Sequence, residues 1–203
     1  KIVFYNLSYV GRPVKTSILT GGLEYETYHR ILSHRHGRSD DPEPNYDLFN
    51  EIVDRREAFI LPSVIKGAGQ FPDSEARVLE YPGPTTTPLA RIESGEAFPE
   101  ALSDYERGLA LVDLSVAIQS VVALRRVGLK PGTELFIEGG FRNNRGYLAF
   151  LSALLPDNPI ALTSVEEATS FGAALCGKAA LEGRPVADLA GSVDLAIQPI
   201  EAA

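Results

Sequence analysis

The chain has 203 residues, of which 44% are hydrophobic and 23% charged, which is typical of a globular protein and excludes a disordered or repeat protein. Its formal net charge of −8 would repel phosphate backbones, so we expect no nucleic-acid partner. A single cysteine, Cys176, excludes an intrachain disulfide framework.

The start of the sequence carries no signal for export. No apolar run is expected to reach the length that is needed to span a bilayer, and the first ten residues lack the charged start and long apolar centre of a signal peptide. We therefore expect a cytoplasmic chain with no membrane partner. Because Lys1 already lies within a predicted strand, the chain is expected to be a fragment of a longer protein.

The first half of the chain mixes short elements with turn-rich segments. Residues 1–10 predict a strand, and extended chain then leads to the pair Gly21–Gly22, which opens a helix over 23–32. Polar residues from Ser33 to Asn45 predict a surface loop. The following predicted elements are a helix over 47–56, a buried strand over 58–64 and irregular chain between Lys66 and Pro99.

The second half is more regular. Ser103 and Glu106 have the spacing of a capping box, which predicts a helix from about Asp104 to Arg126 that ends at Gly128. Apolar residues wrap most of this helix, so it should be buried between layers. The elements expected after it are a strand over 134–138, a helix over 144–155, a strand over 159–163 and a helix capped by Ser164 and Glu167 that ends near Leu181.

Alternating helices and strands with short connections predict an α/β fold, in which 134–138 is a central strand of a parallel sheet with crossover helices. Such sheets bind ligands beyond the carboxyl ends of their strands, where Gly139 and Gly140 stand. Glycines let a ligand approach the backbone, and residues 142–144 offer N–H groups and amide side chains. A tight turn between strand and helix explains the same glycines, and spacing alone favours the turn.

Other polar residues give weaker signals. His29, His34 and His36 lack an accompanying carboxylate spacing, so we expect solvated loop histidines and no metal site. The acidic run over 40–43 predicts a solvated loop. Cys176 lies among small residues with no neighbouring base, which favours a buried small hydrophobic residue over a nucleophile.

The order of the elements from Leu135 to Gly183 resembles the carboxyl-terminal domain of the FGGY family of carbohydrate kinases, members of the actin-like, sugar-kinase-like ATPase superfamily. In that domain a strand ends in a Gly-Gly adenosine motif, and a Glu-Ala step precedes a helix with a Gly-Ala-Ala pattern; here EGG, EEA and GAA occur in that order. Residues 10–26 also resemble the segment after the family's second phosphate loop. The resemblance implies one domain over 1–203 with a ribonuclease H-like fold and a mixed sheet.

The resemblance also implies a site for ATP. Gly140 would pack against the adenosine, and Asn144 would reach adenine or ribose. Glu26 departs from the neutral amide that other members have. The implied ATP-binding residues are Gly139, Gly140, Asn143, Asn144, Gly22 and Glu26.

By the same resemblance, an amino-terminal domain outside this chain supplies the catalytic residues, most of the sugar site and most metal ligands. No catalytic residue is therefore expected here. The full protein would transfer the γ-phosphoryl of ATP, with Mg²⁺, to a ketose, deoxyketose or polyol, while this fragment alone would be inactive. Gly172 and Ala173 would pack at the interdomain hinge, and a homodimer is compatible with the pattern. A non-catalytic nucleotide-binding regulator of the same fold, or an interaction domain without a ligand, remains the alternative.

Overall fold

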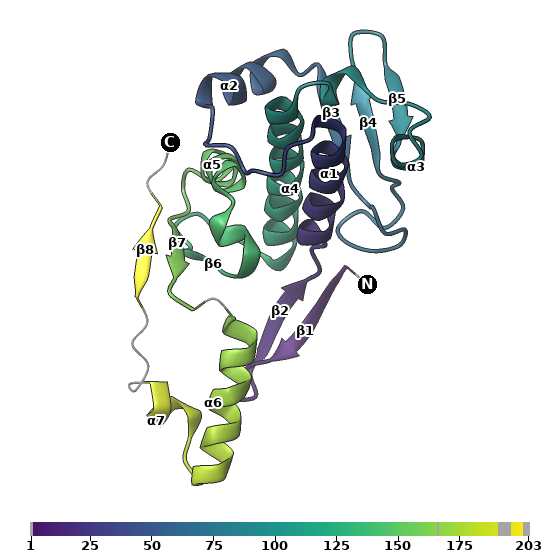
Figure 1. The fold of residues 1–203 in the computed structure, drawn as a ribbon. Helices are drawn as coiled ribbons and strands as arrows, with labels where there is room; N and C mark the ends of the chain where they lie inside the picture. Colours follow the sequence, from purple (N-terminus) through teal and green to yellow (C-terminus); the bar gives the residue numbers. More distant parts are fainter. Residues whose placement is uncertain (1, 166, 191–195, 201–203) are drawn as a thin grey trace.

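The computed structural model describes residues 2–165, 167–190 and 196–200. Two long helices, α1 (Gly21–His36) and α4 (Tyr105–Val127), lie side by side at its centre and carry much of the core (Figure 1). The other helices are α2 (Tyr46–Arg55), α3 (Leu89–Glu93), α5 (Arg145–Leu154), α6 (Ala168–Glu182) and α7 (Val186–Ala190), with the short 3-10 turns η1 (Glu100–Leu102) and η2 (Gly139–Asn143).

The strands of the described residues form three sheets around these helices. One is an antiparallel hairpin of β1 and β2, one is antiparallel with the order β3-β4-β5, and one is mixed with the order β6-β7-β8. The predicted α/β class with a mixed sheet is therefore confirmed. The strands are β1 (Val3–Leu7), β2 (Pro13–Ser17), β3 (Ala58–Leu61), β4 (Arg77–Glu80), β5 (Thr85–Pro88), β6 (Leu135–Ile137), β7 (Ile160–Thr163) and β8 (Ile197–Pro199).

The long predicted helix is confirmed as α4, but its cap is different. Asp104 lies in extended backbone, and its carboxylate accepts a hydrogen bond from the Arg107 N–H at 2.8 Å. Ser103 instead follows the turn η1 with helical backbone angles, so it cannot also start α4. The predicted capping box of Ser103 and Glu106 is therefore wrong, because an acceptor at the next residue takes that role.

Burial of α4 follows from its apolar surface. It packs against α5, α1 and β3, and most of its residues are buried. By length and composition alone α4 could cross a membrane, which corrects the expectation that no apolar run is long enough. However, 78% of its apolar window is buried inside the protein, as in the core helix of a soluble fold. We therefore assign α4 to the core.

The loop predicted over 33–45 is wrong in its first part, because α1 continues to His36 and ends at Gly37, which has a φ of 65°. The last turn is stabilised from outside the helix. The His36 Nε2 lies 3.0 Å from the Leu102 carbonyl, and its ring packs against Tyr105. All three histidines thus lie on α1 rather than in a loop. Tertiary contacts extend a helix whose last turn has no apolar periodicity of its own.

The irregular chain predicted between Lys66 and Pro99 is also wrong. It contains β4, β5 and α3, and the two strands pair with Val78 opposite Thr87, both buried. A run of threonines beside proline looks like a turn in sequence, but β-branched residues also suit a strand once a partner strand is present.

The mixed sheet confirms the parallel crossover but corrects the position of its first strand. β6 and β7 are parallel and are joined by α5. Within the described residues β6 pairs with β7 alone, so it is an edge strand and not the central strand predicted. Helix and strand alternation identifies neighbouring parallel strands, but it does not tell how many strands flank them.

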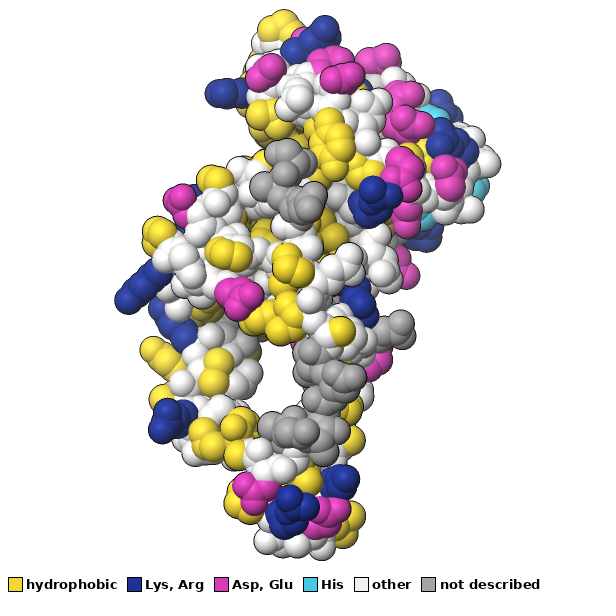
Figure 2. Space-filling view, turned by 90° about the vertical axis from the view of Figure 1, so that its left-hand side faces the viewer, with side chains coloured by type: hydrophobic (Ala, Val, Ile, Leu, Met, Phe, Trp, Pro, Cys, Tyr) yellow, Lys and Arg dark blue, Asp and Glu magenta, His cyan; other side chains and the backbone are white. Residues whose placement is uncertain are grey.

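Helix α6 lies with α7 at one end of the molecule (Figure 1), beside an opening that the space-filling view shows (Figure 2). No side chain caps its start after Glu167; the Ser164 hydroxyl accepts a hydrogen bond from the Ala196 N–H instead, so the predicted cap is wrong. Cys176 is exposed, which corrects its predicted burial. Among the described residues of α6 only Ala179 is buried, because little of the described chain packs against its small side chains.

Candidate functional site

A hollow of about 310 Å³ lies where the start of α1, the loop after α1 and the connection between β6 and α5 meet. Its size is near the lower end of small-molecule sites, roughly 300 to 1,000 Å³, and suits a group such as a nucleobase. Four of the six residues expected to bind ATP line it, while Gly139 and Glu26 do not. The lining residues are Gly22, Tyr25, Asp41, Gly140, Phe141, Asn143 and Asn144.

The glycines of the two pairs have different roles. A Cβ on Gly21 would lie 2.8 Å from Val116 Cγ1, so this glycine allows α1 to begin in close contact with α4. A Cβ on Gly22 or Gly140 would meet nothing within 4 Å. Gly139 has a φ of 70°, which favours glycine and turns the chain out of β6. Gly22 and Gly140 therefore leave the wall of the hollow open to a ligand.

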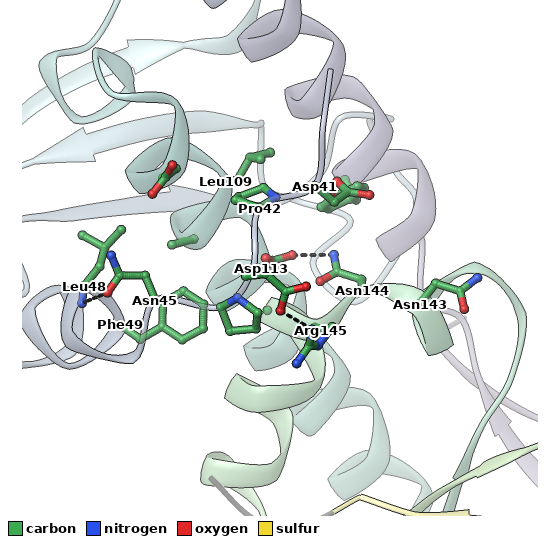
Figure 3. A pocket seen from close by; sticks show the side chains of 16 residues that line it. Asp41, Pro42, Asn45, Leu48, Phe49, Leu109, Asp113, Asn143, Asn144 and Arg145 are labelled. Atoms are coloured by element: carbon green, nitrogen blue, oxygen red, sulfur yellow. Dashed lines mark hydrogen bonds and ion pairs between the residues drawn. The ribbon is translucent and has the colours of Figure 1, made fainter. Parts of the chain in front are cut away.

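The side chain of Asn144 makes two hydrogen bonds with other described residues. Its side-chain oxygen accepts from the Tyr147 N–H at 2.8 Å, which caps α5, and its amide donates to Asp113 Oδ1 at 2.7 Å (Figure 3). Asn143 lies on the far side of Asn144 from Asp113 in the same view. The cap of α5 explains why an asparagine follows the turn η2. A contact of Asn144 with adenosine remains a prediction.

Asp113 is the buried partner that sequence reasoning missed. It projects from α4 with only 6% of its surface exposed, and burial raises its pKa to about 7, although the hydrogen bond from Asn144 acts in the opposite direction. A Cβ on Gly146 would lie 2.3 Å from Asp113 Oδ2, so α5 approaches the carboxyl closely at a glycine. A lone acidic residue inside an apolar helix was the available signal.

Asp41 is the second missed residue. The Tyr25 hydroxyl donates to its Oδ1 at 2.7 Å, and His29 Nε2 lies 3.5 Å from the same oxygen. The Tyr25 and His29 rings stack with centroids 5.5 Å apart. Burial, and to a smaller extent the hydrogen bond to Asp41, raises the pKa of Tyr25 well above its usual value. The Tyr25 hydroxyl therefore keeps its proton and donates the hydrogen bond to Asp41. The side chain of Asp41 is exposed, as predicted for a solvated loop. It also lines the hollow, which was not predicted.

The acidic residues of α1 also differ from expectation. Glu26 is exposed and is not part of the hollow, so its role at ATP remains a prediction. Glu24 is buried, and its Oε1 accepts hydrogen bonds from the N–H groups of Ser63 at 2.7 Å and Val64 at 3.2 Å. Burial raises the pKa of Glu24. Glu24 thus connects α1 to the chain after β3.

Gly172 and Ala173 lie on α6, and neither of them lines the hollow. A Cβ on Gly172 would meet nothing within 4 Å of the described chain, and Ala173 is exposed. Their small side chains leave this face of α6 open for a close approach. Packing at an interdomain hinge remains a prediction.

In the described part of the chain, no group of three or more His, Cys, Asp or Glu side chains is arranged to hold a metal ion. The hollow offers one carboxylate, Asp41, and two amides. This donor set suits a neutral polar heterocycle better than a divalent cation, which needs several oxygen ligands at once.

Comparison with known proteins identifies the family. Residues 3–185 match the family described as carbohydrate kinase FGGY, C-terminal domain. The fold resembles the crystal structure of a carbohydrate kinase from Novosphingobium aromaticivorans, with a TM-score of 0.60 and 24% sequence identity over 98% of this chain. The match covers 36% of that kinase, so this chain corresponds to about a third of its length. No curated protein matches the sequence significantly. The chain belongs to the FGGY carbohydrate kinase family and corresponds to its C-terminal domain.

Proposed function

We propose that this chain is the C-terminal, nucleotide-binding domain of an ATP-dependent carbohydrate kinase with a ribonuclease H-like, actin-like fold. The observation that carries the proposal is the hollow, because segments far apart in sequence meet there and two open glycines, Gly22 and Gly140, form part of its wall. The family match supports the same assignment.

The residues of the hollow suit the base of ATP. Gly22 and Gly140 let a flat ring approach the backbone, and the partly buried rings of Tyr25 and Phe141 add apolar surface. Asn144 holds the start of α5 in place through its cap and through Asp113, so the wall is formed before the ligand arrives. A preformed site loses less entropy on binding than a mobile one.

The remaining chemistry is assigned to the full-length kinase. ATP supplies the phosphoryl group, and we propose in-line transfer to a hydroxyl of a ketose, deoxyketose or polyol. No group of three or more His, Cys, Asp or Glu side chains that could hold a metal ion is present among the described residues, and we expect Mg²⁺ to be held mainly by the phosphates and by the other domain. The residue that accepts the proton of the sugar hydroxyl is expected there too.

Titration of the isolated chain with ATP tests the nucleotide site. We expect amide NMR signals of Gly22 and of residues 140–144 to shift at millimolar ATP. Gly140→Val should abolish the shifts, because the added side chain would occupy space that the base needs. The fold should tolerate the change, since a Cβ at Gly140 would meet nothing within 4 Å. Gly177→Val on α6, which also enters open space, is the matched control and should bind as the native chain does. Unchanged signals in the native chain would contradict the site.

Activity of the full-length protein tests the kinase assignment. We expect ADP release to rise above background with at least one sugar in a panel of pentoses, deoxyhexoses, ketoses and polyols. Nucleotide binding without ADP release on any member of the panel would favour the non-catalytic regulator of the same fold.

A further inference from the structure

Asp41 is the one charged residue among the described residues that line the hollow. Its Oδ1 is engaged by the Tyr25 hydroxyl and lies near His29. No described residue donates a hydrogen bond to its Oδ2. Tyr25 therefore orients the carboxylate through Oδ1, while Oδ2 has no hydrogen-bond partner among the described residues.

Asn143 provides a second free polar group in the hollow. Its neighbour Asn144 uses its amide for Asp113 and its oxygen for the cap of α5. The Asn143 side chain makes no hydrogen bond with the described part of the chain, and Figure 3 shows it pointing away from Asp113. Among the residues that the structure describes, the hollow thus offers one carboxylate oxygen and one amide that have no hydrogen-bond partner.

The charge of the hollow determines which end of a nucleotide it can take. No Lys or Arg is among its described lining residues, and a carboxylate repels a phosphate group. The triphosphate is therefore disfavoured beside Asp41, while a neutral base is not. Because an ionised carboxylate only accepts hydrogen bonds, the base must present an N–H group to it.

We propose that Asp41, oriented by Tyr25, recognises the exocyclic amino group of adenine, and that Asn143 donates to the adjacent ring nitrogen. This inference rests on the proposed function of the hollow as a nucleotide site. Adenine presents an amino donor beside a ring acceptor, and the wall of the hollow carries a carboxylate, Asp41, and an amide, Asn143, that could meet these two groups. Asp41 is then a residue that determines the choice of nucleotide, and Tyr25 is a positioning residue.

Calorimetric titration with ATP and with purine riboside triphosphate, which is ATP without its 6-amino group, tests the proposal. The native chain should bind ATP about tenfold more tightly or better, since one hydrogen bond to a charged group is lost with the analogue. Asp41→Ala should bring the two dissociation constants close together. Tyr25→Phe keeps the ring but releases the carboxylate, so it should give an intermediate ratio.

Asp40→Ala is the matched control, because Asp40 pairs with Arg38 on the surface and does not line the hollow. It should keep the native preference for ATP. Unfolding curves of all variants check that each is folded, which is expected because the Asp41 side chain is 67% exposed.

The outcomes separate this inference from the function on which it rests. Binding of ATP with an unchanged ratio in Asp41→Ala would overturn the role of Asp41 and leave the nucleotide site standing. A native preference for GTP that Asp41→Ala removes would show that the carboxylate recognises guanine N–H groups, which overturns the adenine assignment. Absence of binding by any nucleotide to the native chain would overturn the proposed function itself.

Discussion

At the scale of single residues, Asp113 couples the core to the edge of the hollow. It is an acidic group inside the apolar helix α4, and its described partner is the amide of Asn144 at 2.7 Å. Removing a charge from water is costly unless it is compensated, so burial favours the protonated form of this carboxyl.

We predict that Asp113 makes stability depend on pH. Its pKa in the folded state, about 7, is above the ordinary value of 3.8, so the folded chain binds more protons between these values. The free energy of unfolding relative to Asp113→Asn should therefore fall as pH rises from about 4 to about 7 and then become level. The slope cannot exceed about 1.4 kcal/mol per pH unit. Urea unfolding of both proteins across this range measures it.

The isosteric variant Asp113→Asn is the reference for the native chain. Other titrating groups contribute equally to the free energy of unfolding of both proteins, so their contributions cancel in the difference. A difference that stays constant over the whole range, or that rises with pH, would show that Asp113 has an ordinary or lowered pKa in the folded chain.

At the scale of elements, the contact between α4 and α5 depends on a glycine in the first turn of α5. Gly146 has no side chain where Asp113 Oδ2 approaches, and a Cβ there would also lie 3.2 Å from Asp113 Cγ. The two helices can come this close only without that atom, and the cap by Asn144 lies within the same contact.

Gly146→Ala should therefore destabilise the chain by about 1 to 3 kcal/mol, since a buried group must move to admit the methyl. Gly177→Ala is the matched control: it also replaces a helical glycine, but in open space, and should stabilise by about 0.5 to 1 kcal/mol through helix propensity. Chemical denaturation gives both values. Equal stabilisation by the two changes would contradict the packing at Gly146.

At the scale of the whole molecule, the core is concentrated on α1, α4 and α5, while α6 and α7 lie at one end (Figure 1). α6 buries only Ala179 among its described residues, and Leu181 is 91% exposed. Within the described part of the chain, little buried apolar area holds this helix to the other elements.

Hydrogen exchange of the isolated chain should reflect this difference. We expect the amides of α6 to exchange orders of magnitude faster than those of α4, because α6 can open locally while α4 opens only when the core unfolds. Exchange measured by mass spectrometry compares the two helices in one experiment. The buried helix α5 is the control for helix length, because it is shorter than α6. Equal protection of α6 and α4 would show that α6 is covered in solution, as a homodimer could do.

The sequence by itself determined the elements that depend on local chemistry. The run of apolar residues and its end at Gly128 located α4, although the predicted cap was wrong, and the order of strand, glycine pair and helix located β6 and α5 together with Gly140. These signals are local because a helix or a turn is specified mostly by neighbours along the chain. The family resemblance rested on the same order.

Only the tertiary structure decided which residues meet. Asp41 reaches the hollow from a loop that looked merely solvated, Asp113 pairs with Asn144 from another helix, and β6 is an edge strand. These relations join residues that are distant in sequence, and no spacing along the chain encodes them. They arise because α1, α4 and α5 can bury their apolar faces only by packing together, and that packing sets which polar groups line the hollow.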